Sequence, residues 1–222
     1  MIKTGISTLE DVIGLYRKRA KRYDLTANLY YLIGFREWAY RKQAVAALNL
    51  QPGDTVVEIG CGTGLNFPLL QAAVGPQGQV IGVDLTDAML AQASQRVERA
   101  GWSNVVLVHR DAGEYNFPEK VDGIISTFAI TLAPGFDRII KHGARALAPG
   151  KRFVILDFKE PYQLPDWLVK FAVFITRPFG VTRELAVRHP WESIEQYMTN
   201  TSFEEQFMGF TYISTGEAHK PG

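Results

Sequence analysis

The stretch TVVEIGCGTGLNFPLL, residues 55–70, joins a short apolar run to an acid and then to three glycines at alternate positions. Its first five residues are typical of a buried strand, and the apolar residues after the glycines are typical of a helix. Glycine in a strand-to-helix turn lets the backbone approach a ligand closely. The stretch therefore predicts a ligand-binding turn between a strand and a helix.

Strand-like and helix-like segments alternate after this turn. Further strands are expected at 79–84, 104–111, 121–128 and 151–158, and helices at 87–101 and 137–150. This alternation implies βαβ units, and therefore a parallel sheet with helices on both faces. Residues 203–218 read as two strands around Gly209, so that a hairpin would close the sheet. We expect an α/β, Rossmann-like sheet of seven strands, mostly parallel, with an antiparallel last strand.

Helical patterns flank this core on both sides. Aromatic and aliphatic residues recur at helical spacing within residues 8–48, which predicts an N-terminal helical cap. Two more helices are expected at 166–180 and 191–200. We expect a single domain, residues 1–222. Its parts would be a helical cap (1–50), a ligand-binding core (51–158), and substrate-side helices with the closing hairpin (159–222).

The composition is that of a soluble globular protein, with 46% apolar and 21% charged residues in 222. A net charge of +1 gives no global reason to expect a nucleic-acid partner. The single cysteine, Cys61, excludes an intramolecular disulfide and favours a reducing compartment. We find no signal-peptide core and no apolar run of the roughly 18 residues that a spanning helix needs. We expect a cytoplasmic protein, and the sequence leaves its oligomeric state open.

Two features leave room for contact with a membrane surface. Residues 1–45 hold nine basic and four acidic residues, a net charge of +5. This is either a solvated helix face or a surface drawn to anionic lipid or an acidic substrate. The segment WLVKFAVFITRPF, residues 167–179, is strongly apolar. It is either a buried helix, a lid over an apolar acceptor, or a surface that dips into a membrane.

The residues around the glycines indicate what binds there. A dinucleotide fingerprint would place a third glycine where this chain has Leu65, so the match to a pyrophosphate site is poor. Glu58, Asp84 and Asp111 lie at the ends of the first three strands and are expected to face one crevice. Such acids disfavour a pyrophosphate. They suit a ligand with a cation and a ribose, because a carboxylate can accept hydrogen bonds from both ribose hydroxyls.

Four segments together resemble a known family. VVEIGCGTG, VIGVDLTDAMLAQA, RDAGEYNF and LAPGKRFVILDF are similar, in order and spacing, to the motifs of class I S-adenosylmethionine-dependent methyltransferases. The resemblance covers residues 55–158. It implies a methyltransferase that uses S-adenosylmethionine and releases S-adenosylhomocysteine.

The resemblance also implies which residues contact the cofactor. The methionine part would lie against the turn and the acid before it, which comprise Glu58, Gly60, Cys61, Gly62, Thr63, Gly64 and Asn66. The adenosine part would be held after the second and third strands, by Asp84 at the ribose, Leu85 and Met89 beside the adenine, and Asp111 and Ala112 at its amino group and ring. Three further residues would face cofactor and acceptor, namely Tyr23, Thr127 and Phe128.

A narrower resemblance concerns the acceptor. YDLTANLYYLIGFREWAYRK (23–42), LDFKEP (156–161) and HPWESIEQYM (189–198) resemble the ubiquinone/menaquinone-biosynthesis C-methyltransferases, whose layout phospholipid N-methyltransferases largely share. TNTSFEEQF stands where the quinone enzymes usually show a Gly-Phe element. The resemblance implies a small, lipid-like or aromatic acceptor, methylated at a quinone-type carbon or oxygen. The alternatives are N-methylation of a phospholipid or small amine, and a non-catalytic cofactor-binding protein.

Two residues are candidates for catalysis. The sulfonium is already activated, so methyl transfer needs mainly position and in-line geometry. A ring carbon also needs a base or a water relay to raise its electron density. His189 is the candidate base or substrate contact, with a purely structural role as the alternative, and Tyr23 would lie over the reacting groups. No His/Cys/Asp cluster has metal-ligand spacing, so we expect no metal.

Overall fold

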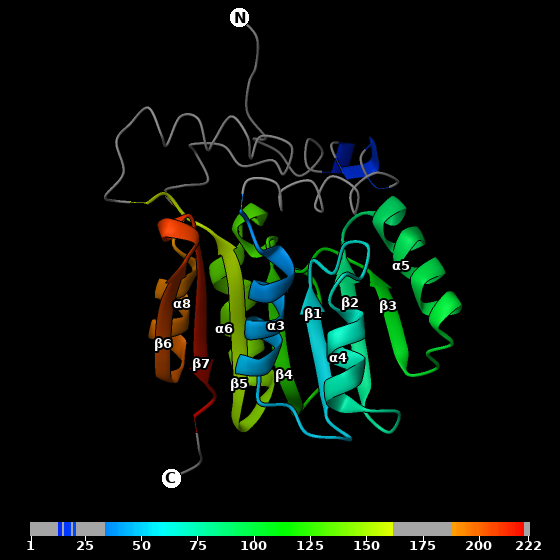
Figure 1. Ribbon diagram of the computed structural model, residues 1–222. Coiled ribbons are helices and arrows are strands. Elements are labelled where there is room, and N and C mark those ends of the chain that lie inside the picture. The colour runs from blue at the N-terminus through cyan, green and yellow to red at the C-terminus, as the bar shows by residue number, and fades with distance from the viewer. Residues whose placement is uncertain (1–12, 15, 19, 21–33, 162–187, 220–222) are drawn as a thin grey trace, which may run out of the picture.

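A computed structural model describes residues 13–14, 16–18, 20, 34–161 and 188–219 (Figure 1). These residues form a seven-stranded sheet in the order β3-β2-β1-β4-β5-β7-β6. The strands are β1 (Thr55–Ile59), β2 (Gln79–Asp84), β3 (Val105–His109), β4 (Val121–Thr127), β5 (Leu147–Phe158), β6 (Thr199–Gln206) and β7 (Thr211–Glu217). The order reverses next to β1, which places the glycine turn at the switch point of the sheet, where α/β proteins bind ligands.

Strand directions agree with the expected fold. The strands β3, β2, β1, β4 and β5 are parallel, and Val56 of β1 pairs with Val80 on one side and Gly123 on the other. The strand β7 runs antiparallel to both its neighbours, β5 and β6. The prediction of a mostly parallel, Rossmann-like sheet with an antiparallel last strand is confirmed.

Helices cover both faces of the sheet, as Figure 1 shows. The described helices are α3 (Glu37–Ala47), α4 (Phe67–Val74), α5 (Asp87–Ala100), α6 (Phe136–Ala146) and α8 (Pro190–Tyr197), with 3-10 turns η3 (Ile130–Leu132) and η5 (Phe207–Gly209). Side chains alternate along each strand. Val56 therefore packs in the core under α3, α4 and α5, while Val57 packs in the core under α6 and α8.

Some expected boundaries are wrong. The helix expected at 137–150 ends at Ala146, and β5 begins at Leu147, because Gly150 donates a backbone hydrogen bond to Ala218 O at 3.0 Å. The helix expected at 191–200 ends at Tyr197, because Thr199 pairs with Glu217 of β7. In both cases, hydrogen bonding to a neighbouring strand places in the sheet residues that the local sequence pattern had assigned to a helix. The apolar segment 167–179 lies outside the described residues.

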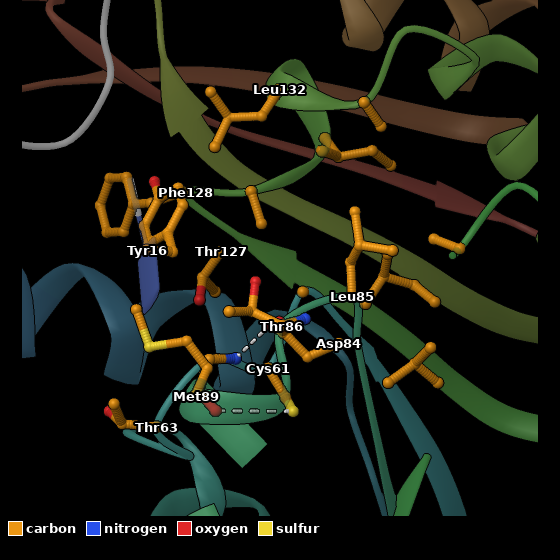
Figure 2. A pocket seen from close by; sticks show the side chains of 18 of the residues that line it. Tyr16, Cys61, Thr63, Asp84, Leu85, Thr86, Met89, Thr127, Phe128 and Leu132 are labelled. Atoms are coloured by element: carbon orange, nitrogen blue, oxygen red, sulfur yellow. Dashed lines mark hydrogen bonds between the residues drawn. The ribbon is translucent and has the colours of Figure 1, made fainter. Parts of the chain in front are cut away.

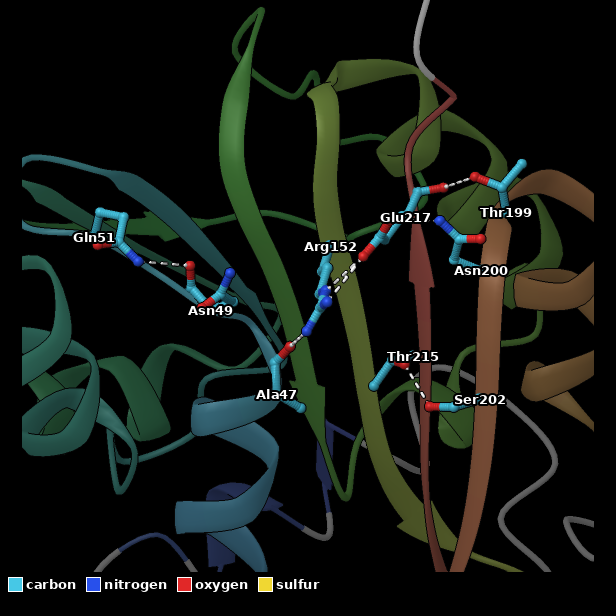
Figure 3. A network of polar contacts seen from close by, with 9 residues as sticks. All are labelled: Ala47, Asn49, Gln51, Arg152, Thr199, Asn200, Ser202, Thr215 and Glu217. Carbon is cyan, nitrogen blue, oxygen red and sulfur yellow. Dashed lines mark hydrogen bonds and ion pairs between the residues drawn. The ribbon is translucent and has the colours of Figure 1, made fainter.

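A polar cluster fixes the C-terminal end of α3 (Figure 3). Arg152 of β5 donates from Nη1 to the carbonyl oxygen of Ala47, the last residue of α3, at 3.1 Å. Its Nε and Nη2 donate to Glu217 Oε1 of β7, at 3.1 and 2.8 Å. A cation at a helix C-terminus satisfies carbonyls that have no partner within the helix. The cluster thus ties α3 to β5 and β7, and α3 carries side chains to the site described next.

Candidate functional site

A cavity opens at the carboxyl ends of β1, β2, β3 and β4 (Figure 2). It is lined by eleven of the expected cofactor residues, namely Gly60, Cys61, Gly62, Thr63, Asp84, Leu85, Met89, Asp111, Ala112, Thr127 and Phe128. Tyr16 lines the same cavity and lies near Phe128 in Figure 2. Residues from four separate strand ends thus converge on one hollow.

Other expected site residues are not part of this lining. Gly64 lies behind the turn, where a Cβ on it would be 2.5 Å from the Phe67 ring. Glu58 and Asn66 are buried beneath the turn, with exposed fractions of 1% and 0%. Tyr23 lies outside the described residues. The turn therefore has a surface that faces the cavity and a buried underside.

The turn needs glycine at its start for two reasons. Gly60 has φ +67°, in the left-handed region, and a Cβ there would lie 2.3 Å from the Cβ of Ala129, just after β4. Gly62 has φ +54° and open space around it, and its N–H donates to Asp84 Oδ2 at 2.8 Å. The turn is thus pressed against the end of β4 on one side and open on the other.

Asp84 is the last residue of β2 and links the turn to the next loop. Its Oδ2 accepts from Gly62 N and its Oδ1 from Thr86 N, both at 2.8 Å. Burial raises the pKa of Asp84, while these hydrogen bonds oppose the shift. Each carboxylate oxygen has a second lone pair. Asp84 can therefore brace the turn and still accept hydrogen bonds from two neighbouring hydroxyls.

Beyond Asp84 the cavity becomes an apolar slot with an acid at its end. Leu85 and Met89 supply the apolar wall, and Met89 is only 2% exposed. Asp111 follows β3, and its Oδ1 accepts from Gly113 N at 2.7 Å. An apolar slot with a hydrogen-bonding acid suits a flat, polar-edged heterocycle. Arg110 lines this end as well, and sequence reasoning missed it.

Phe128, directly after β4, adopts an unusual backbone conformation. Its φ is +55°, which is rare for a bulky residue, and its N–H donates to Leu156 O at 2.7 Å. Its ring packs against Phe158 at 4.7 Å and Phe35 at 5.9 Å between ring centroids. A strained backbone conformation persists only where the surrounding structure holds it in place. Such residues are found most often at functional sites.

A buried polar network lies under the cavity on the α3 side. Arg41 of α3 pairs with Glu37, one helical turn earlier, with Nε and Nη2 at 2.8 and 2.7 Å from Glu37 Oε1. Its Nη1 donates to Thr127 Oγ1 at 2.6 Å and to Asn66 Oδ1 at 3.1 Å. Asn66 Nδ2 in turn donates to Glu58 Oε1 at 2.6 Å. This network joins α3, the turn and the ends of β1 and β4.

The expectation that Glu58 faces the crevice is therefore wrong. Glu58 is the penultimate residue of β1, so its side chain points to the α3 face, between Val57 and Ile59, which pack in the other core. Burial raises its pKa to about 8, although Arg41 and Asn66 oppose the shift. Its Oε2 is buried and has no hydrogen-bond partner among the described residues. Glu58 is therefore mostly a neutral acid near pH 7.

Sequence reasoning missed Glu37 and misread Arg41. Arg41 was counted among the basic residues of 1–45, which were expected on a solvated helix face or on a surface drawn to anionic lipid or an acidic substrate, but it is 4% exposed and ion-paired. A signal was present in the spacing. Glu37, Arg41, Ala44 and Val45 follow an i, i+4, i+7, i+8 pattern, and all four are buried in α3. Charges on the apolar stripe of a helix are expensive unless they are paired, so they mark a polar site in the core.

Cys61 of the turn and the candidate base His189 lie in different environments. Burial raises the pKa of the Cys61 thiol, which keeps it protonated and agrees with a small turn residue rather than a nucleophile. His189 precedes α8, where its Nδ1 lies 2.9 Å from Glu192 Oε1 and its ring stacks on Trp191 at 4.5 Å. His189 does not line the cavity that the described residues form. We therefore assign it no role as a base.

None of the helices among the described residues is both long and apolar enough to cross a membrane. Within the same residues, no group of three or more His, Cys, Asp or Glu side chains is placed to hold a metal ion.

Comparisons with known proteins point to one class. A family described as a methyltransferase domain matches residues 56–150. A demethylmenaquinone methyltransferase from Listeria welshimeri is 25% identical over 92% of this chain and 89% of its own length. The corresponding Bacillus cereus protein is 30% identical over 68% of this chain and 64% of its own. The structure of an S-adenosylmethionine-dependent methyltransferase from Aquifex aeolicus shares the fold, with TM-score 0.61, 20% identity and coverage of 80% and 89%.

The fold and these matches define the class of the protein as a class I S-adenosylmethionine-dependent methyltransferase. Within that class, the two relatives named above, at 25% and 30% identity, are demethylmenaquinone methyltransferases. Its cofactor is S-adenosylmethionine. The cavity suits this cofactor, because it combines a glycine turn, an acid with spare acceptor sites and an apolar slot.

Proposed function

We propose that this enzyme methylates a ring carbon of a reduced, quinol-type aromatic acceptor that carries an apolar tail. The observation that supports it best is the extent of the match to a demethylmenaquinone methyltransferase, 92% of this chain and 89% of the relative. The general methyltransferase family matches only residues 56–150. The likeness to the relative therefore extends into the segments on either side of the cofactor core.

The lining near Phe128 supports an apolar acceptor. Ile130 and Leu132 of η3 face the cavity beside it. The Phe128 ring is backed by Phe35 and Phe158, whose own rings stack at 5.9 Å between centroids. Apolar and aromatic walls bind a flat ring through burial and favourable ring contacts.

We propose a definite orientation for the cofactor. Its methionine part lies against Gly60–Gly64, its ribose on Asp84, and its adenine in the slot of Leu85 and Met89 that ends at Asp111. Thr127 and Phe128 then face the reacting end. S-adenosylmethionine supplies a methyl group on a sulfonium, a leaving group that needs no further activation. The chain contributes binding and in-line placement, and the proton that the methyl group replaces on the ring carbon would pass to a water relay as S-adenosylhomocysteine leaves.

The acceptor side of the cavity is completed, in this proposal, by the flanking segments 1–50 and 159–222 of a single domain. An acceptor with an apolar tail resides in a membrane, so the enzyme would meet it at the membrane surface. Co-sedimentation with anionic phospholipid vesicles, compared with neutral ones, tests this contact. Equally negligible binding of the protein to both kinds of vesicle would contradict the proposed contact with the membrane surface.

The deciding experiment follows a labelled methyl group. Purified enzyme is incubated with methyl-labelled S-adenosylmethionine and, separately, a reduced demethylmenaquinone, phosphatidylethanolamine and a pool of small amines. We expect label in the quinol, on a ring carbon located by mass spectrometry. A reaction without enzyme gives the background of the assay, and the Asp84→Ala variant should incorporate less label at low cofactor concentration because it loses the proposed ribose contact.

Other distributions of the label would contradict the proposal. Label on the quinol oxygen would agree with the proposed acceptor class but would contradict methylation at a ring carbon. Label in phosphatidylethanolamine or a small amine would replace ring methylation with N-methylation. A lack of label in all three fractions, with S-adenosylmethionine still bound, would overturn the proposed acceptor.

A further inference from the structure

The short turn η3, which follows β4, supplies part of the cavity wall on the side proposed for the acceptor (Figure 2). Ile130 and Leu132 line the cavity that the described residues form, whereas Thr131 between them does not and is 5% exposed. Within the turn, Leu132 N donates to Ala129 O at 3.0 Å. A 3-10 turn has poor hydrogen-bond geometry by itself. The place of this wall therefore depends on contacts from outside the turn.

The buried acid Asp157, one residue before the end of β5, holds the amide side of η3. Its Oδ2 accepts from Thr131 N at 3.1 Å, and its Oδ1 accepts from Phe158 N at 2.8 Å. Burial raises the pKa of Asp157 to about 6, while these hydrogen bonds oppose the shift. The carboxylate is therefore mostly ionised at pH 7, and hydrogen bonds to an ionised group are stronger than neutral ones.

An arginine holds the carbonyl side of the same turn. Arg188, just before the first turn of α8, donates from Nη1 to Thr131 O at 2.8 Å and to Leu132 O at 3.2 Å. It lies 57 residues from Thr131 in the sequence. The Thr131 residue is thus bound through its N–H by an acid of β5 and through its carbonyl by an arginine near α8. Contacts from two separate elements fix both the place and the tilt of η3.

The two charged residues act on the acceptor side of the cavity. Neither belongs to the lining that the described residues form, so each can influence the cavity only through η3. The residues proposed to hold ribose and adenine come from other elements, since Asp84 ends β2 and Met89 lies in α5. A buried carboxylate is costly unless donors satisfy it, and part of that satisfaction is here supplied by the backbone of the wall.

We propose that Asp157 and Arg188 are positioning residues for the acceptor, and that by holding η3 from its amide and carbonyl sides they set the wall against which the acceptor ring lies. This inference rests on the proposed function, which places an aromatic acceptor beside η3. Neither residue contacts the acceptor or the cofactor in this account. Loosening η3 should therefore weaken acceptor binding and leave cofactor binding intact.

The first test needs no acceptor. Amide hydrogen exchange is followed over residues 129–133 with S-adenosylhomocysteine bound, in the wild type and in Arg188→Met, which keeps an apolar stem and loses the donors. We expect exchange to become about tenfold faster or more in Arg188→Met, because hydrogen bonds to a charged group are lost. Arg188→Lys should be intermediate, since an ammonium can still reach one carbonyl. Calorimetric titration of S-adenosylhomocysteine should give affinities within about threefold of the wild type.

The second test measures kcat and KM for whichever acceptor takes label in the wild type, among reduced demethylmenaquinone, phosphatidylethanolamine and the small amines. We expect Arg188→Met and Asp157→Asn to raise the acceptor KM by about tenfold and to lower kcat by less than about threefold. The amide of Asp157→Asn keeps one acceptor oxygen, so it loses one of the two backbone contacts. A merely structural role would lower the amount of folded enzyme, and thus the apparent kcat, without changing KM.

A matched control uses another arginine that donates to a backbone carbonyl. Arg152 donates to Ala47 O at the end of α3, and it does not line the cavity formed by the described residues. Arg152→Met should lower the melting temperature, yet leave the acceptor KM and exchange over residues 129–133 unchanged. A thermal melt establishes that each variant is folded before it is assayed.

The outcomes separate this inference from the acceptor proposal. The inference is overturned if Arg188→Met leaves exchange over residues 129–133 unchanged, or if the folded variants keep the wild-type acceptor KM. It is also overturned if they lose affinity for S-adenosylhomocysteine as strongly as for the acceptor. Failure of the acceptor proposal appears in the wild type instead, as label in another fraction or in none. If no fraction takes label, the exchange test alone decides the inference.

Discussion

The ends of β1 and β2 each place an acid beside the glycine turn, yet the two acids lie in different environments. Asp84, the last residue of β2, lines the cavity and accepts hydrogen bonds from Gly62 N and Thr86 N. Glu58, one residue before the end of β1, points away from the cavity and bonds to Asn66. A difference of one residue in the distance from the strand end therefore separates an acid that faces the cavity from one that supports the turn from below.

The difference shows that position within a strand matters as much as proximity to a motif. Side chains alternate between the faces of a sheet, and only at the last residue can a side chain lean over the strand end. Asp84 is placed to act on a ligand, whereas Glu58 holds Asn66 and, through it, Arg41. The predictions below test this division, beginning with the change of largest expected effect.

The tightest point at the end of β1 is Gly60. Gly60→Ala should reduce the free energy of unfolding by about 3 kcal/mol or more, because the new Cβ would overlap Ala129 and the backbone has a left-handed φ. Gly62→Ala should cost only about 1 kcal/mol, since the same backbone strain arises there without a clash. Urea unfolding of the two variants measures both values. Equal losses would show that the turn is not pressed against β4.

Glu58 should make stability depend on pH. Its folded pKa of about 8 lies above its ordinary value of 4.5, so the folded state holds a proton that the unfolded state releases. The free energy of unfolding should therefore fall as pH rises from about 4.5 to about 8, and about 2–3 kcal/mol of it should be lost between pH 6 and pH 8. Glu58→Gln should remove that fall, because the amide mimics the neutral acid. Urea unfolding at several pH values measures the slope.

Asp157 provides the matched control. Burial raises its pKa to about 6, so it contributes a slope of the same sign that ends near pH 6. Asp157→Asn should make the free energy of unfolding fall less steeply with pH below about pH 6. It should leave the fall between pH 6 and pH 8, which comes from Glu58, unchanged. If Glu58→Gln leaves the upper window unchanged, Glu58 is ionised at pH 7 and the picture of a neutral acid fails.

The smallest effect is expected at Asp87, three residues beyond Asp84. Its carboxylate makes an exposed ion pair with Arg17, and both side chains are more than half exposed. Exposed pairs contribute little, because water screens them and two mobile side chains must be ordered. Asp87→Asn should leave cofactor affinity unchanged in calorimetric titration. A clear loss of affinity would extend the ligand-facing region well beyond the strand end.

Sequence patterns were sufficient for the sheet and for most of the cavity lining. The bounds of β1 and β2 match those expected, because apolar runs closed by an acid and glycine leave few alternatives. Residues that follow strand ends, such as Asp84, Asp111 and Phe128, could be placed because parallel strands end at the same edge of a sheet.

The remaining features depended on contacts distant in sequence. Gly150 and Thr199 were assigned to helices by local pattern, and pairing with the segment around Glu217 decided otherwise. The network that joins Glu37 and Arg41 of α3 to Glu58 of β1 runs through Asn66, which is 25 residues from Arg41, and finding it required knowing which face each strand residue takes. Proximity to the motif suggested the wrong face for Glu58.

One titration tests the central claim, that Asp84 contacts the cofactor and Glu58 supports the turn from below. S-adenosylhomocysteine is titrated at pH 7 into Asp84→Ala and Glu58→Gln side by side. We expect Asp84→Ala to weaken binding by about tenfold or more, because a bidentate contact to the ribose is lost, and Glu58→Gln to change it by less than about threefold. Unchanged affinity in Asp84→Ala, or a larger loss in Glu58→Gln than in Asp84→Ala, would contradict the account.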